Sequence, residues 1–154
     1  MSIDYRQLYI GGQWSDPAKT ETIDVHTPTT EEQIGSVPRG SETDVDSAVA
    51  AARAAFDDPD GWSNWSPAQR GEVLERFAAE LEARGEETAR RVSMQNGMPI
   101  WLAHQFEAGF PPLLLRYYSG LMNGMPAEEA RPGMLGGTAL VSRHPVGVGA
   151  AITP

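Results

Sequence analysis

The hydrophobic and polar positions change their spacing several times along the chain, and each change predicts a different kind of element. The first forty residues carry short apolar arms separated by turn residues. Residues 8–14 place Gly11-Gly12 between two such arms, which predicts a hairpin. Residues 22–25 and 33–37 are β-prone, with a proline turn at 27–29 between them. Together these segments predict a small β meander.

From residue 41 onward the apolar positions recur at helical spacing. Ser41 can cap the free amides of a first helix, which ends in an acidic turn at 57–61. One narrow apolar face is formed by Val45, Ala48, Val49, Ala52 and Phe56. The acidic turn lacks the alternating ligands and the distal Glu of an EF-hand loop, so we expect a solvated turn and no calcium site.

Four further helical segments follow. Ser66, Pro67 and Gln69 form a capping signature for the second helix, and Gly85 allows a break before a third helix that Gly97 closes. We expect two helical segments at the end of this region, over residues 100–110 and 112–121. Pro111-Pro112 removes two amide donors and should kink or split the helix between them.

The end of the chain returns to a β pattern. Residues 125–137 hold two Pro and three Gly, which predicts a loop or a bulged strand, and residues 138–143 are β-prone. Residues 146–152 have no polar side chain, a pattern typical of a strand buried on both faces of a parallel sheet. The whole pattern predicts an α/β chain whose last strand lacks the neighbours and covering helices that it needs.

Composition and charge narrow the classes of function. The chain has 21 acidic and 12 basic residues, and only Arg90-Arg91 stand adjacent, so neither nucleic acid nor an anionic membrane is an expected partner. No apolar stretch approaches the ~18 residues of a membrane span, and we expect a cytoplasmic protein. The absence of Cys excludes a disulfide framework, a thiolate metal site and a cysteine nucleophile within these residues.

The residues alone reveal no catalytic constellation. His104 and Glu107 are too few ligands for a metal site, so no metal is expected. No Gly-x-Ser-x-Gly elbow, phosphate loop or His-Glu-x-x-His motif is present. Gly147 and Gly149 begin like a dinucleotide fingerprint, but Ile152 stands where the third glycine would be.

The order of the segments resembles the N-terminal part of the aldehyde dehydrogenase superfamily. The resemblance is carried, in register, by residues 8–14, 27–38, 44–56, Trp65-Ser66-Pro67, Arg70, Leu74, Arg116-Tyr117-Tyr118-Ser119-Gly120 and Arg143-His144-Pro145-Val146-Gly147-Val148. It covers nearly the whole chain.

The resemblance implies an organisation and a reaction. Residues 1–124 correspond to the N-terminal part of the cofactor-binding domain, residues 125–144 to a β extension used for oligomerisation, and residues 145–154 to the first strand of a Rossmann-like sheet. In the family a Cys thiolate attacks the aldehyde, hydride passes to NAD or NADP, and a Glu activates water to release a carboxylic acid. That Cys, that Glu and the Trp-Asn that follows Pro154 in the family are not among these residues, so the resemblance implies an incomplete N-terminal segment that is inactive alone.

The resemblance also assigns secondary roles to residues that are present. Ile152, Thr153 and Pro154 match the segment that lines the cofactor cleft, and Phe106 and Phe110 fall on the helix that borders the aldehyde tunnel. Residues 125–143 imply a homodimer or homotetramer of the intact protein. A second hypothesis, from another class, is a non-catalytic truncated module that assembles with a full-length relative through this extension and an open sheet edge.

Overall fold

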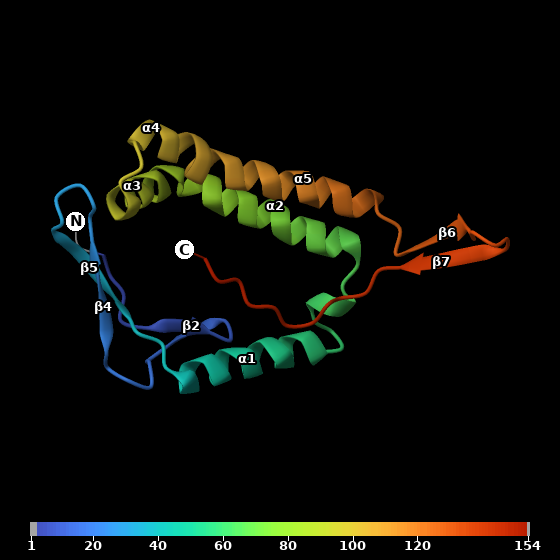
Figure 1. Ribbon diagram of the computed structural model, residues 1–154, viewed down its shortest axis with the longest axis horizontal. Coiled ribbons are helices and arrows are strands. Elements are labelled where there is room, and N and C mark those ends of the chain that lie inside the picture. The colour runs from blue at the N-terminus through green and yellow to red at the C-terminus, as the bar shows by residue number, and fades with distance from the viewer. Residues whose placement is uncertain (1–2, 154) are drawn as a thin grey trace.

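The computed structural model describes residues 3–153 as an elongated molecule made of two groups of elements (Figure 1). One group holds the N-terminal strands and helix α1 (Glu42–Asp57). The other is a helical group in which α2 (Pro67–Ala83) and α5 (Phe110–Gly124) run antiparallel side by side. A hairpin of β6 and β7 projects from one end of the helical group.

The N-terminal strands form two small sheets, and the predicted single meander is therefore wrong. Strands β1 (Ile3–Asp4), β5 (Gln33–Pro38) and β4 (Thr22–His26) form one sheet in the order β1-β5-β4, with β1 parallel to β5. Within residues 3–153, strands β2 (Leu8–Ile10) and β3 (Gln13–Ser15) pair only with each other. The difference arises because β1 skips its sequence neighbours and takes its hydrogen-bond partners from β5, more than thirty residues later.

The β2–β3 hairpin was predicted from its turn, and the structure confirms it. Gly11 and Gly12 have φ angles of 61° and 83°. A two-residue turn of this kind requires a positive φ at both central positions, which glycine adopts without steric cost.

Helix α1 begins at the predicted cap, but the chief acceptor is Asp44 in its first turn. The Asp44 carboxylate accepts hydrogen bonds from the Ser41 amide at 2.8 Å, the Ser41 hydroxyl at 2.7 Å and the Ala18 amide at 2.9 Å. The Ser41 amide contributes most to holding the pKa of Asp44 below its ordinary value. These bonds fix the start of the helix to the segment between β3 and β4.

Helices α2 and α3 (Gly85–Asn96) follow the predicted capping rules. The Ser66 amide donates to Gln69 Oε1 at 2.9 Å, and the Gln69 amide donates back to Ser66 Oγ at 3.3 Å. Gly97 ends α3 with a φ of 76°, and its amide donates to the Ser93 carbonyl at 3.0 Å.

The run around Pro111-Pro112 does not split into two helices. Helix α4 (Ile100–Leu102) continues into a π-helical segment, η2 (Ala103–Gly109), and then directly into α5. The Phe110 amide donates to the Gln105 carbonyl, five residues back. The two prolines follow in the first turn of α5. Proline has no backbone N–H, and the change of hydrogen-bond register in η2 lets the helix continue past the two missing donors.

The most buried apolar residues are small and belong to the helical group. Ala78, Ala89 and Ala103 have no exposed surface, and the side chain of Pro112 is fully buried. Ser119 of α5 donates from its hydroxyl to the Gly71 carbonyl of α2 at 3.0 Å. Small side chains and this bond allow α2 and α5 to approach closely.

The last two strands form a hairpin, and the described residues after them form no strand. Strands β6 (Glu128–Pro132) and β7 (Thr138–Ser142) are antiparallel, with Ala130 opposite Leu140. The prediction of a buried strand at 146–152 differs from the structure, which has no regular element over 143–153. The reason is that no other described strand lies beside this segment to share hydrogen bonds with it.

Candidate functional site

Phe106 and Phe110, the residues predicted to border a tunnel, lie at the junction of η2 and α5. Their side chains are 51% and 47% exposed, so neither belongs to the core of the described chain. The π register between them alters their relative rotation from that of an ordinary helix. Both rings are about half exposed, and their role in a tunnel stays a prediction.

The predicted cofactor segment is extended and open. The side chain of Ile152 is 95% exposed, Thr153 is also exposed, and Pro154 lies outside the described residues. Gly147 has a φ of 101°, and a Cβ at this position would lie 3.7 Å from Arg53 Nη2. In Figure 1 this red segment lies on the α1 side of α2, whereas the start of α5 lies on the other side. The described chain therefore does not bring the two predicted sites together.

His104 contacts a different carboxylate from the one its spacing indicates. Its Nε2 lies 3.4 Å from Glu86 Oε2 of α3, and Glu86 also accepts a hydrogen bond from Arg90 at 2.7 Å. Within residues 3–153, no cluster of three or more His, Cys, Asp or Glu side chains could hold a metal ion. In the same range, no helix has the length and apolarity to cross a membrane.

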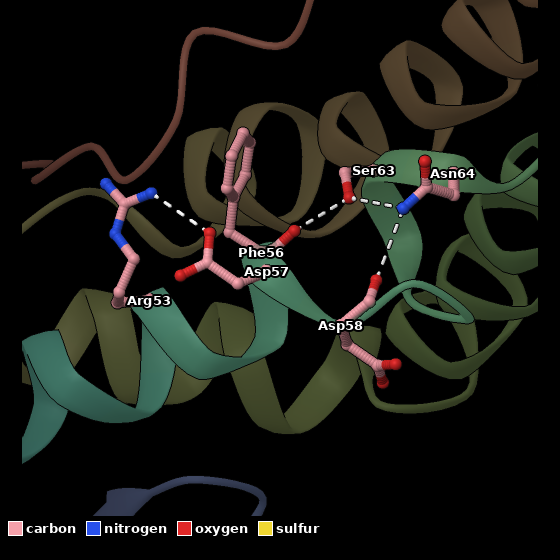
Figure 2. Close-up of polar contacts among 6 residues, drawn as sticks. All are labelled: Arg53, Phe56, Asp57, Asp58, Ser63 and Asn64. Carbon is pink, nitrogen blue, oxygen red and sulfur yellow. Dashed lines mark hydrogen bonds and ion pairs between the residues drawn. The ribbon is translucent and has the colours of Figure 1, made fainter.

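The acidic turn after α1 is tied by hydrogen bonds to the short 3₁₀ helix η1 (Trp62–Asn64), as Figure 2 shows. Ser63 donates to the Phe56 carbonyl at 2.8 Å, and the Asn64 amide group donates to the Asp58 carbonyl at 3.2 Å. The Asp58 side chain is exposed and accepts the Asp60 amide at 3.0 Å. These bonds hold the turn in place and seat η1 against the end of α1.

A groove that the sequence did not reveal lies beside η1, with a volume of about 590 Å³. It is bounded by η1, the first turns of α2 and the segment 143–147, and we call it the η1 groove. Its lining includes Trp62, Trp65, Arg70, Arg143 and His144. In the sequence, Arg70 and Arg143 stand out only as parts of a resemblance, because only the fold brings residues about seventy positions apart to one surface.

Arg116 joins the two long helices through a forked ion pair. Its guanidinium Nη1 and Nη2 donate to the two carboxylate oxygens of Glu82, the second at 2.8 Å, and its Nε lies 3.4 Å from Glu75. The hydrogen bond from Arg116 is the main cause that lowers the pKa of Glu82, and the same bond raises the pKa of Arg116. Arg116 thus helps to position α5, and with it Phe110, against α2.

Comparison with known proteins identifies the class to which this architecture belongs. Residues 14–154 match the Aldehyde dehydrogenase family. The geranial dehydrogenase of Castellaniella defragrans is 46% identical over 154 residues, covering 100% of this chain and 32% of that protein. The 3-succinoylsemialdehyde-pyridine dehydrogenase of a Pseudomonas species is 37% identical over 98% of this chain and 30% of its own length.

A solved structure gives the same result for the fold. The crystal structure of a Mycobacterium tuberculosis aldehyde dehydrogenase complexed with NAD+ superimposes with a TM-score of 0.83 and 32% identity, over 95% of this chain and 30% of that one. The chain belongs to the aldehyde dehydrogenase family and has the fold of its N-terminal part. It spans about a third of the length of the relatives that it matches.

Proposed function

We propose that this chain is the N-terminal segment of an NAD(P)+-dependent aldehyde dehydrogenase that oxidises an aldehyde to a carboxylic acid. The observation that carries the proposal is the match over residues 14–154, supported by 46% identity to a geranial dehydrogenase along all 154 residues. The residues present contain no Cys, so the nucleophile is proposed to belong to the part of the relatives that this chain does not span.

The cofactor is proposed to bind along the segment that ends at Ile152 and Thr153. When bound, NAD(P)+ supplies the acceptor for the hydride that leaves the aldehyde carbon. The residues fit such a group: residues 145–153 have no acidic side chain to repel its phosphates, and Ile152 offers a nearly fully exposed apolar surface. The hydroxyl of Thr153 adds a hydrogen-bonding group, and Pro154 completes the proposed set.

Phe106 and Phe110 are proposed to contact the apolar part of the aldehyde. Their half-exposed rings on η2 and α5 support this role, because aromatic side chains line most small-molecule sites. In a full-length form, Phe110→Ala should raise KM about tenfold with little change in kcat, since uniform binding is lost. Tyr118→Ala, on the same helix but outside the proposed tunnel, serves as the matched control, and an equal effect of both variants would contradict the assignment.

The proposed organisation keeps residues 1–124 in a cofactor-binding domain, residues 125–144 as an oligomerisation extension and residues 145–154 as the first strand of a Rossmann-like sheet. All five residues of β7 are exposed, including Leu140 at 64%, which supports a homodimer or homotetramer through 125–143. The same exposed strand favours the second candidate, a non-catalytic module that assembles with a longer relative.

A cytoplasmic location is also proposed, because the residues present include no disulfide framework.

The proposed reaction is tested with a chimera in which residues 1–154 are followed by the remaining two-thirds of the geranial dehydrogenase relative. The chimera should reduce NAD+ or NADP+ only when an aldehyde is added. Replacement of the catalytic Cys in the added part is the control and should abolish turnover. A folded chimera without turnover would contradict the enzymatic proposal and favour the second candidate, the non-catalytic module. Co-purification of the chain with a longer homologue would support that second candidate.

A further inference from the structure

The η1 groove has a charge opposite to that of the molecule. The chain has a net charge of −9, yet the described residues that line the groove include Arg70, Arg143 and His144 and no acidic side chain. Three basic side chains from two distant segments therefore face one concave surface. Such a local field concentrates anions even in an acidic protein.

Arg70 is the least satisfied of these three groups. Its Nη1 donates to the Trp62 carbonyl at 3.5 Å, and its Nε is buried with no hydrogen-bond partner. No described carboxylate forms an ion pair with Arg70. Arg70 lines the groove, and no described carboxylate neutralises its charge, so the guanidinium attracts an anionic ligand there.

Arg143 supplies the second guanidinium from the other side of the groove. Its Nη1 donates to the Pro126 carbonyl at 2.9 Å, and its Nη2 lies 3.8 Å from Glu129 Oε2. Its side chain is 40% exposed, and the long contact to Glu129 neutralises its charge only in part. His144 Nε2 is 2.9 Å from Ser142 Oγ, which keeps the imidazole at the groove edge.

Two indole rings form an apolar wall beside the two guanidinium groups. The ring centroids of Trp62 and Trp65 are 5.8 Å apart at an interplanar angle of 50°. The Trp65 indole N–H donates to the Asp60 carbonyl at 2.7 Å, which fixes that ring, and Trp62 is 44% exposed. A flat apolar group fits this wall, while a forked anionic group fits the guanidinium donors.

We propose that the η1 groove is a binding site for a small aromatic carboxylate. Arg70 and Arg143 bind the carboxylate, and Trp62 and Trp65 contact the ring. A volume of about 590 Å³ lies within the range of small-molecule sites. The four side chains that bind the carboxylate are distinct from those proposed to contact the cofactor or the aldehyde, although residues 145–147, which also line the groove, belong to the proposed cofactor segment.

The test is a titration of the ¹⁵N-labelled 154-residue chain with benzoate, followed through the indole N–H signals of its four Trp residues. The signals of Trp62 and Trp65 should shift and saturate, and those of Trp14 and Trp101 should stay in place. Benzamide has the same ring without the charge, and inorganic phosphate has charge without a ring. Each should bind at least about tenfold more weakly than benzoate, the loss expected for a missing charged hydrogen bond or a missing apolar contact.

Variants locate the interaction on the guanidinium groups. Arg70→Gln should weaken benzoate binding by about tenfold or more, and Arg76→Gln, an exposed Arg on the same helix, should leave it unchanged. If the Arg70→Gln chain loses its helical circular dichroism signal, the Arg143→Gln chain is used instead to test whether benzoate binding depends on a guanidinium group of the groove. Equal affinities for benzoate and benzamide, shifts confined to Trp14 or Trp101, or benzoate binding unaffected by either variant would overturn the proposal.

Discussion

The α2–α5 pair and the β6–β7 hairpin make opposite uses of their apolar residues. In the helix pair, small side chains such as Ala78 are completely buried, and Ser119 bonds across to Gly71. In the hairpin, Leu140 is 64% exposed, and every residue of β7 faces the surroundings. The helix pair buries its own contact surface, whereas the hairpin has apolar side chains that the described residues do not cover.

Helix α1 resembles the hairpin in this respect. Val45 and Val49 belong to its predicted apolar face, but they are 58% and 51% exposed. An amphipathic pattern indicates that the apolar face of a helix packs against another element, but it does not identify that element. A family in which the relatives are about three times as long as this chain gives a direct reason for such uncovered faces.

The largest expected effect comes from a charge placed inside the helix pair. Ala78→Asp would bury a carboxylate without a partner and should lower the free energy of unfolding by about 3 kcal/mol or more. Ala79→Asp, one position along and exposed, should change it by about 0.5 kcal/mol or less. Thermal unfolding followed by circular dichroism separates the two, and similar losses would show that the α2–α5 interface is not closed.

A second, smaller effect concerns Gly97, where the helical group meets the strands. Its φ is 76°, and a Cβ would lie 3.0 Å from Pro28 Cγ, so Gly97→Ala should destabilise the chain by about 1–2 kcal/mol. Gly120 lies within α5 with open space around it, so Gly120→Ala should stabilise the chain by about 0.5–1 kcal/mol. Urea titration gives both values, and the same sign for the two would refute the comparison.

A charge on the hairpin should leave the isolated chain almost unaffected. Leu140→Lys replaces an exposed side chain, so the free energy of unfolding should change by about 0.5 kcal/mol or less. In the chimera the same change should lower the number of associated subunits, because it puts an ammonium group into the proposed interface. Sedimentation of the chimera measures this, and an unaltered subunit number would exclude 125–143 as the interface.

The smallest expected effect is on the pH dependence of the helix pair. The lowered pKa of Glu82 means that its ion pair with Arg116 stabilises the fold above the ordinary Glu pKa, about 4.3, and that this contribution is lost as the pH falls below it. The difference in unfolding midpoint between the native chain and Glu82→Gln should therefore shrink from about pH 6 to about pH 3. Glu80→Gln, exposed on the same helix, is the control and should show no such trend.

Local chemistry made much of this fold predictable. Gly11-Gly12 specified the hairpin, Ser66 with Gln69 specified the start of α2, and Gly97 specified the end of α3. Each of these signals acts within a few residues, so the sequence contains everything that is needed to read it.

The features that escaped prediction depend on distant residues. The parallel pairing of β1 with β5 joins segments thirty-two positions apart, and no local pattern marks it. The η1 groove unites Arg70 with Arg143, which only the packed chain brings together. The apolar run at 146–152 was predicted as a buried strand, but hydrophobicity alone does not supply the neighbouring strand on which a ladder depends.

The central proposal is that this chain is part of an aldehyde dehydrogenase whose chemistry depends on residues that the chain does not contain. Aldehyde-dependent NADH or NADPH formation, measured for the 154-residue chain and for the chimera side by side, tests it most directly. We predict no formation by the chain alone and sustained turnover by the chimera. Turnover by the 154 residues on their own, which hold no Cys, would contradict the account.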